Sequence, residues 1–322
     1  MRAMRLHALG GALTLDTVPT PAPGPGEVLV AVEACGINFG DTLIVTGQYQ
    51  EKFDLPLIPG MEIAGTVTAL GAGVTGFAPG DRVASYAGAG GLAEYSALPA
   101  VRCVPLPPAM DSVTAAAFLV AYGTSHVALG PKAGLKAGET LLVLGAAGGV
   151  GLTAVELGKL MGARVIASAR GAEKLAIAKA AGADHGIDSE TADLRAEVKA
   201  LGGADVVYDP VGGDQFDAAL RATRPEARIL PLGFASGRVP QIPANILLVK
   251  NLTVLGFYWG GYATLRPSVL TDSFRVLFDW YTDGKLKPHV SHVLPLAEAN
   301  AALDLLRSRR ATGKVVVKVA AA

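Results

Sequence analysis

A run of glycines between two apolar segments has the clearest chemical meaning in this chain. Residues 141–145 read LLVLG, a strand pattern, and lead through AAGGVG into residues 152–161, where apolar residues recur at helical spacing. In a strand–turn–helix unit of this kind, glycines let the backbone approach a pyrophosphate that faces the helix N-terminus. A second strand at 164–169 supplies the context that the motif requires, so the segment predicts dinucleotide binding. The residues expected to line the turn are Gly145, Ala146, Ala147, Gly148, Gly149, Val150 and Gly151.

The end of the second strand indicates which nicotinamide cofactor binds. A site for NAD normally places Asp or Glu there, where the carboxylate binds the ribose 2′-hydroxyl. This strand ends in Ser168, Ala169 and Arg170, with Lys174 four residues later and no acid. Two cations and a hydroxyl suit a 2′-phosphate, so we expect NADPH. The alternative is that Arg170 and Lys174 are a solvated helix start.

Two later segments place glycines directly after a strand. They are residues 208–213 (YDPVGG) and 230–237 (LPLGFASG). Open α/β sheets bind ligands at the carboxyl ends of their strands, so these loops are expected to face the cofactor unless they are plain turns. The candidate contacts are Asp209, Val211, Gly233, Phe234 and Ser236.

The composition excludes several classes of protein. The chain has 322 residues, 51% of them hydrophobic, which predicts one large or two medium domains. Lys plus Arg and Asp plus Glu are both 28, which argues against nucleic acid as a partner. Only two cysteines are present, as expected in a reducing cytosol. Without a signal-like N-terminus or a long apolar stretch, we expect a soluble cytoplasmic protein with no membrane span.

The chain changes character along its length. The first third holds short strands with turn signals every 8–12 residues, which predicts a barrel-like β domain. The middle third alternates strands and helices, which predicts a doubly wound parallel sheet. The expected strands are 141–144, 164–169, 205–208, 228–232 and 252–257, and the expected helices are 112–129, 150–161, 172–181, 216–221, 268–284 and 296–308. A closing strand at 314–319 is expected to return to the β domain.

Several short motifs occur in an order typical of one family. They are G-x-N-x-x-D at 36–41, GQY at 47–49, PGMEIAG at 59–65, GDRV at 80–83, the glycine turn, VYD at 207–209 and ATGKVV at 311–316. Over essentially the whole chain this order resembles the quinone oxidoreductases, the zeta-crystallin-like, zinc-free branch of the medium-chain dehydrogenase/reductase superfamily. The resemblance implies an α/β fold. A GroES-like, β-barrel-type catalytic domain would hold residues 1–122 and 264–322, and a doubly wound (Rossmann) NADPH domain would hold 123–263.

The residues at the zinc positions of related enzymes argue against a metal. Zinc-bearing relatives such as alcohol dehydrogenases carry Cys where Asn38 stands and His where Met61 stands. Catalytic zinc takes three Cys, His or carboxylate ligands, which these residues do not supply. His289 and His292 form a pair without a third ligand, and Cys35 is expected to be a small core residue. We therefore expect no metal.

By resemblance, Asn38 contacts the nicotinamide ribose and Tyr49 faces the substrate pocket. The Asn38 amide and the Tyr49 phenol are also the best candidate donors for negative charge that develops on a substrate oxygen. A related enoyl-thioester reductase branch uses a tyrosine at a similar place as proton donor. Alternatively, Asn38 only ties a turn and Tyr49 only caps a domain edge.

The remaining predictions are less specific. Phe257, Tyr258 and Trp259 follow a predicted strand and either line the cofactor and substrate site or pack in the core. Arg309 is the candidate for an arginine that reaches the cofactor in relatives, although Arg310 fits that position equally well. The strand before Tyr258 pairs across a two-fold axis in relatives, which implies a homodimer.

The leading functional interpretation is an NADPH-dependent reductase of quinones or activated enones that uses neither metal nor flavin. Its substrate would be a small molecule. An enoyl-thioester or acryloyl-type reductase is the second interpretation. A non-catalytic, crystallin-like NADPH-binding protein is the third. One scaffold hosts many chemistries, so the fold alone does not choose among them.

Overall fold

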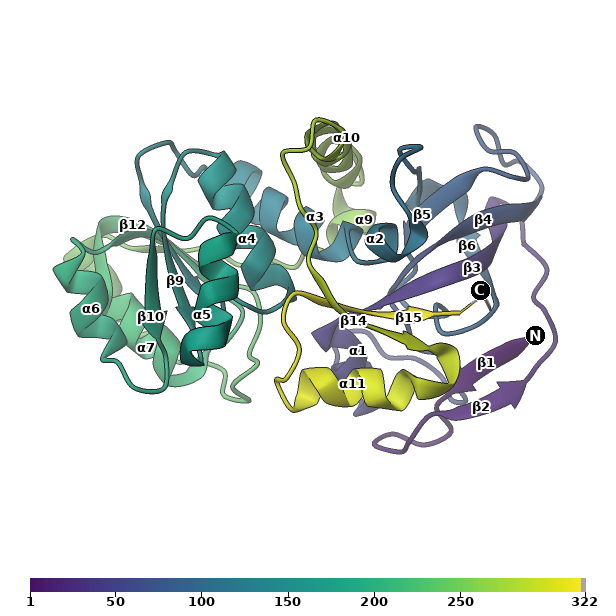
Figure 1. Cartoon of the computed structure of the whole chain (residues 1–322), viewed down its shortest axis with the longest axis horizontal. Helices are drawn as coiled ribbons and strands as arrows, with labels where there is room; N and C mark the ends of the chain where they lie inside the picture. The colour runs from purple at the N-terminus through teal and green to yellow at the C-terminus, as the bar shows by residue number, and fades with distance from the viewer. Residues whose placement is uncertain (320–322) are drawn as a thin grey trace. The chain divides into compact units, whose positions relative to one another are not determined.

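The computed structural model describes residues 1–319 and divides the chain into two compact units. The first unit holds Met1–Val120 together with the segment from Pro288 onward, and the second holds Ala121–Lys287. Figure 1 labels their elements, with the second unit drawn mostly in teal and green. Unit two is therefore an insertion between two segments of unit one.

The second unit is built on a six-stranded sheet in which every pairing is parallel. Its strands are β8 (Thr140–Leu144), β9 (Arg164–Ala169), β10 (His185–Asp188), β11 (Ala204–Asp209), β12 (Thr223–Pro231) and β13 (Thr253–Val254). The order β10-β9-β8-β11-β12-β13 reverses direction between β8 and β11, which is the pattern of a dinucleotide-binding sheet. The predicted doubly wound sheet is confirmed.

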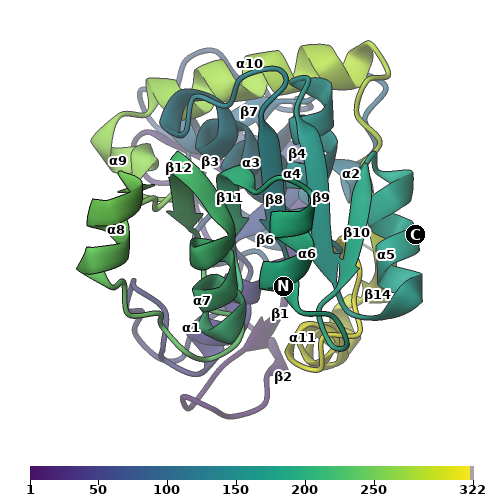
Figure 2. The ribbon, with the colours of Figure 1, turned by 90° about the vertical axis from the view of Figure 1, so that its left-hand side faces the viewer.

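Helices precede, connect and follow these strands, and the central strand β8 is buried on both faces. They are α3 (Leu119–Val127), α4 (Gly149–Leu160), α5 (Gly171–Ala180), α6 (Leu194–Ala200), α7 (Gly213–Ala222), α8 (Ala244–Lys250), α9 (Tyr262–Leu265) and α10 (Ser268–Thr282). Residues from α6, α7 and α8 share one hydrophobic cluster with the sheet. Figure 2 labels these helices and strands β8 to β12 of the sheet. Every residue of β8 is buried, which explains its uninterrupted apolar sequence.

The first unit is a mostly antiparallel sheet in the order β14-β15-β3-β4-β5-β7, with β6 also paired to β3. Its elements are β1 (Arg2–Arg5), β2 (Thr14–Thr17), β3 (Glu27–Ile37), α1 (Phe39–Val45), β4 (Glu62–Leu70), β5 (Arg82–Tyr86), β6 (Tyr95–Pro99), β7 (Cys103–Pro105), α2 (Ser112–Ala116), β14 (Val290–Pro295), α11 (Ala299–Arg307) and β15 (Lys314–Lys318). The closing strand β15 pairs with β3, so its predicted return to the β domain is confirmed.

The observed division differs from the predicted boundaries after residues 122 and 263. The second unit runs to Lys287 and includes α10. Helix α10 belongs to this unit because it packs on other parts of it. The ring of Phe274 on α10 meets Trp259 edge-on at 6.1 Å. An added Cβ at Gly123 would lie about 3 Å from both rings, so α3 passes directly beside them.

Three local predictions were inexact. The strand expected at 252–257 is reduced to the two residues of β13, and the helix expected at 112–129 breaks between α2 and α3. Elements β10, α6 and α8 were not predicted, because each has seven residues or fewer and little periodicity. No helix within residues 1–319 is both long and apolar enough to cross a membrane.

Candidate functional site

The glycine turn predicted to bind a dinucleotide connects β8 to α4. Gly145 adopts φ +59°, a conformation that favours glycine, and its carbonyl accepts a bond of 2.9 Å from the Gly148 amide. A Cβ at Gly151 would lie 2.2 Å from the Gly145 carbonyl oxygen, so only glycine lets the helix approach the turn this closely. No side chain caps the start of α4, and its first turn carries no acid. Its first backbone N–H groups therefore suit an anionic ligand.

The end of β9 holds the residues predicted to bind a 2′-phosphate. Ser168 is buried, and its Oγ has no hydrogen-bond partner within residues 1–319. Arg170 is the residue that precedes α5, and its guanidinium forms a loose pair with Glu190, with 3.7 Å between Nη1 and Oε1. Lys174 lies in the first turns of the same helix and is half-buried. The structure thus brings these three residues to one edge of the sheet.

The carboxyl group of Asp188 lies beside this edge and was not among the predicted cofactor contacts. Asp188 ends the unpredicted strand β10, next to β9, and its Oδ1 accepts from the amides of Gly171 and Glu190 at 3.1 Å. These two amides lower the pKa of the Asp188 carboxyl below its ordinary value. Two carboxylates therefore lie near the predicted phosphate site. Recognising β10 as a strand would have shown that its end is adjacent to β9.

The loops after β11 and β12 pack against each other at the same edge. Asp209 accepts at Oδ1 from the amides of Val211, 2.7 Å away, and Gly212, 2.9 Å away. Its Oδ2 is buried without a partner in the described part of the chain, and burial raises the pKa of Asp209 to about 6. The Ser236 amide donates to the Val211 carbonyl at 2.9 Å, which joins the two loops. Four predicted contacts, Val211, Gly233, Phe234 and Ser236, lie in these loops.

The aromatic segment after β13 divides between two environments. Trp259 is 5% exposed and packs against Phe274, as a core residue does. Tyr258 is 39% exposed, and Phe257 lies 6.0 Å from the ring of Tyr262. Packing thus accounts for Trp259, while the proposed role of Phe257 and Tyr258 stays a prediction.

In the first unit, Asp41 ties together the segments that carry Asn38 and Met61. Asp41 is completely buried in α1, and its Oδ2 accepts from the Asn38 amide at 2.8 Å. Its Oδ1 accepts from the amides of Gly60 and Met61 at 3.1 Å. Burial raises the pKa of Asp41 to about 6, against the lowering effect of those amides and of the Lys314 ammonium.

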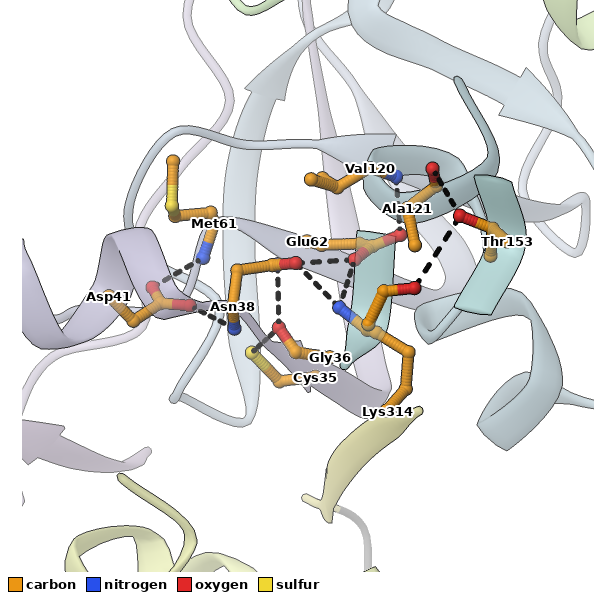
Figure 3. A network of polar contacts seen from close by, with 11 residues as sticks. Cys35, Gly36, Asn38, Asp41, Met61, Glu62, Val120, Ala121, Thr153 and Lys314 are labelled. Atoms are coloured by element: carbon orange, nitrogen blue, oxygen red, sulfur yellow. Dashed lines mark hydrogen bonds and ion pairs between the residues drawn. The ribbon is translucent and has the colours of Figure 1, made fainter. Parts of the chain in front are cut away.

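A buried ion pair lies next to this anchor (Figure 3). Lys314 Nζ donates to Glu62 Oε2 at 3.0 Å and to Asn38 Oδ1 at 2.6 Å. Asn38 Nδ2 donates to Glu62 Oε2 at 3.2 Å and to the Gly36 carbonyl at 3.3 Å. The Val120 amide donates to Glu62 Oε1 at 2.8 Å. Glu62 is fully buried and Lys314 is 5% exposed, so this charged cluster is shielded from water.

Sequence reasoning quoted both charged residues inside motifs but did not connect them. Glu62 and Lys314 are 252 positions apart. The available signal was an acid and a base, each at the first position of a mainly apolar strand, because a charge that is buried there needs a partner.

Tyr49 lies beside the same segment. A Cβ at Gly40 in α1 would be 2.8 Å from Met61 Sδ and 3.2 Å from the Tyr49 ring, so the three side-chain positions are adjacent. The Tyr49 side chain is half-buried. The structure thus brings together Asn38, Met61 and Tyr49.

Two further predicted residues have simpler surroundings. Cys35 is completely buried in the core cluster of the first unit, where burial and the carboxylates of Asp41 and Glu62 raise the pKa of its thiol. Arg309 follows α11 at φ +56° and is exposed, and the Arg310 guanidinium donates to Ser308 at 2.9 Å. Neither arginine is thereby assigned to a ligand.

Each of the two units contains a segment that matches a known protein family. Residues 24–108 match the family described as alcohol dehydrogenase GroES-like domain, and residues 149–274 match the one described as zinc-binding dehydrogenase. A quinone oxidoreductase-like protein 2 homolog of Nematostella vectensis is 42% identical, over 98% of this chain and 88% of that protein. The quinone oxidoreductase-like protein 2 of Bos taurus is 39% identical, over 99% of this chain and 92% of that protein.

The chain belongs to the quinone oxidoreductase family of the medium-chain dehydrogenase/reductase superfamily. Its fold matches a crystal structure of Escherichia coli quinone oxidoreductase complexed with NADPH, with a TM-score of 0.94 and 31% identity over 99% of this chain and 100% of that one. The predicted family is confirmed. The fold class, a GroES-like domain and a Rossmann-type parallel sheet, is confirmed as well.

The name of one matching family implies zinc, but the donor set described above does not fit it. Asn38 and Met61 are poor zinc ligands, and the oxygens of Asn38 and Glu62 already contact the Lys314 ammonium. Within residues 1–319, no group of three or more His, Cys, Asp or Glu side chains is arranged to hold a metal ion.

Proposed function

We propose that this chain is an NADPH-dependent reductase of quinones or activated enones that works without metal or flavin. The observation that carries the proposal is the pairing, in one chain, of a dinucleotide-binding crossover with a zinc-type segment whose ligand positions hold Asn38 and Met61. The homologous Escherichia coli enzyme is named a quinone oxidoreductase and was crystallised with NADPH. That relationship supports the cofactor and the reaction class.

The second unit would hold the nucleotide. The turn from Gly145 to Gly151 would bind the pyrophosphate at the start of α4, while Ser168, Arg170 and Lys174 would bind the 2′-phosphate. The loops that carry Asp209, Val211, Gly233, Phe234 and Ser236 would complete the site. Bound NADPH supplies a hydride to an electrophilic carbon conjugated to a carbonyl. Arg309, Phe257 and Tyr258 are further proposed contacts of the cofactor or substrate.

In the first unit, Asn38 would contact the nicotinamide ribose and Tyr49 would face the substrate. Hydride addition places negative charge on a substrate oxygen, and a phenol hydrogen directed at that oxygen stabilises the charge in a site shielded from water. Replacing Tyr49 with Phe should lower kcat more than it weakens NADPH binding, since the contact forms in the transition state. Wild-type turnover in this variant would remove Tyr49 from the mechanism.

The central experiment is NADPH oxidation by chelator-treated protein with 1,4-benzoquinone as the acceptor. Rapid turnover, with NADH clearly poorer, is the expected result. The same assay with an enoyl thioester tests the second interpretation, and turnover on the thioester alone would replace the proposed substrate class. NADPH binding without turnover on either acceptor would favour a non-catalytic role.

We also propose that the protein is a cytoplasmic homodimer. β13 is an edge strand of its sheet, and such edges readily pair with another strand. Close to it in sequence, Leu248, Val249 and Leu265 are each more than 75% exposed. Light scattering should give the mass of two chains, and replacing Leu248 and Val249 with Lys should shift it to one. A wild-type monomer would overturn the proposal.

A further inference from the structure

The amide of Asn38 is held in one orientation by its charged neighbours. A lysine ammonium has only hydrogens to offer, so the atom 2.6 Å from Lys314 Nζ must be the amide oxygen. A carboxylate only accepts, so the atom 3.2 Å from Glu62 Oε2 must be the amide nitrogen. If the two atoms were exchanged, the amide NH2 group would face the Lys314 ammonium, which is also a donor, and the amide oxygen would face the Glu62 carboxylate, which is also an acceptor. The Lys314–Glu62 pair therefore determines which way the amide points.

The hydrogen-bonding capacity of Asn38 is unequally used in this orientation. Its Nδ2 carries two hydrogens, and both are directed at acceptors, Glu62 Oε2 and the Gly36 carbonyl. Its Oδ1 has two lone pairs and accepts one hydrogen bond, from Lys314 Nζ. Asn38 is also the N-cap of α1, and the Asp41 amide that faces its side chain in a capping box is bonded to the Asn38 main-chain carbonyl at 3.0 Å. Asn38 can thus accept one more hydrogen bond but has no hydrogen left to donate.

We propose that Lys314, balanced by Glu62, is a positioning residue that makes Asn38 an acceptor for a ribose hydroxyl of the cofactor and prevents it from donating to the substrate oxygen. This inference rests on the proposed function. It separates the two roles predicted for Asn38 and leaves the Tyr49 phenol as the remaining predicted donor. The ammonium contributes a fixed positive charge without touching the substrate.

The hydrogen bonds of the Lys314–Glu62 pair favour a fixed orientation of the Asn38 side chain. Desolvating a lysine and a glutamate is costly, and a buried pair of this kind is weak evidence for stability on its own. Such groups hold one another in place when each of them is hydrogen-bonded, because a satisfied network rigidifies its members. Here the network includes Asn38, a residue of the predicted site.

The test measures dissociation constants for two ligands by fluorescence titration. One is NADPH, and the other is 2′-phosphoadenosine 5′-diphosphate, which lacks the nicotinamide ribose. Lys314→Met should weaken NADPH binding about 10-fold, the cost of one hydrogen bond. It should leave binding of the diphosphate unchanged. An equal loss for both ligands, or no loss for NADPH, would overturn the proposal.

A double-mutant cycle shows whether Lys314 acts through Asn38. Asn38→Ala and Lys314→Met should each weaken NADPH binding about 10-fold, and the double variant should also lose about 10-fold, because both changes remove one interaction. A combined loss near 100-fold would overturn the proposal. Lys318→Met is the matched control on the same strand, since Lys318 is exposed and should bind as the wild type does.

A charge-balanced variant covers the case in which Lys314→Met fails to fold. Glu62→Gln with Lys314→Met removes both charges and keeps an acceptor for the Val120 amide. The new amide group would face Asn38 and favour the opposite orientation of its amide, so NADPH binding should again fall about 10-fold. Unchanged binding in this variant would overturn the proposal. If wild-type protein binds NADPH but reduces no acceptor, the proposed function fails while these binding measurements still decide the role of Lys314.

Discussion

The candidate site residues of the two units, taken separately, treat buried polar groups in opposite ways. In the first unit, Glu62 is fully buried, and its two oxygens accept from Val120, Asn38 and Lys314. In the second unit, Ser168 Oγ and Asp209 Oδ2 are buried without partners in the described chain. A network with every group matched holds its shape without a ligand, whereas unmatched groups gain free energy when a ligand supplies the missing bonds. The Glu62 cluster of the first unit is thus organised in advance, and the strand ends with Ser168 and Asp209 in the second unit retain capacity for binding.

Removing the anion of the matched network should have the largest effect. Glu62→Ala leaves the Lys314 ammonium buried and unpaired, so we expect unfolding free energy to fall by about 3–5 kcal/mol. Denaturant unfolding measures this. The control is Glu94→Ala, which breaks the exposed pair with Arg2 and should cost about 0–1 kcal/mol. Equal losses in the two variants would show that the buried network is no stronger than a surface pair.

Substitution of two glycines in the β8–α4 turn distinguishes an effect on stability from an effect on NADPH binding. Gly151→Ala places a Cβ 2.2 Å from the Gly145 carbonyl oxygen, so stability should fall by about 1–3 kcal/mol. At Gly148 the nearest atom would be 3.3 Å away, and Gly148→Ala should unfold at nearly the wild-type temperature. Both variants should bind NADPH more weakly. A stable Gly151→Ala protein would mean that the helix can move away from the turn.

The residues at the end of β9, where Arg170 pairs loosely with Glu190, should determine the preference for NADPH over NADH. Arg170→Ala and Lys174→Ala should each raise the KM for NADPH about 10- to 100-fold, the value of a charge-assisted bond, with little change for NADH. Glu190→Gln is the counterpart, because it frees Arg170 from a competitor and should lower the KM for NADPH slightly. Unchanged selectivity in both alanine variants would place the phosphate site elsewhere.

The last expected effect concerns the free oxygen of Asp209. Its folded pKa of about 6 exceeds the ordinary value of 3.8, so the folded state holds the proton more tightly than the unfolded state. The stability from this proton is complete below pH 3.8 and is lost as the pH rises through 6. Relative to Asp209→Asn, the wild type should lose about 2 kcal/mol between pH 4 and 7. A constant difference across this range would show that Asp209 stays ionised.

Much of the second unit was predictable from its sequence because its signals are local. The glycine turn lies between an apolar strand and an amphipathic helix, and each part is read within about ten residues. The missed strand β10 has only four residues, HGID, with a glycine among them. Without this strand in the prediction, the position of Asp188 beside the end of β9 could not be inferred, since strand neighbours depend on the order of the sheet rather than on distance along the chain.

The candidate site of the first unit was predictable only in part. Motifs placed Asn38 and Tyr49 near the chemistry, but the partners of the Asn38 side chain depend on how β3, β4 and β15 pair. Pairing between segments more than 250 residues apart leaves no local pattern. For the same reason, the sequence could not show that both hydrogens of the Asn38 amide already have acceptors, Glu62 and the Gly36 carbonyl.

The strand that carries Lys314 also has a consequence for protein synthesis. The ribosome makes Asn38, Asp41 and Glu62 early, then the whole second unit, and only then β15. Until that strand emerges, the Glu62 carboxylate has no cation and β3 has one edge unpaired by its final neighbour. The second unit can complete its own sheet in the meantime, because all six of its strands precede residue 288. Strand β15, which is translated after the whole second unit, therefore adds the final partner of β3 and supplies the cation that pairs with Glu62.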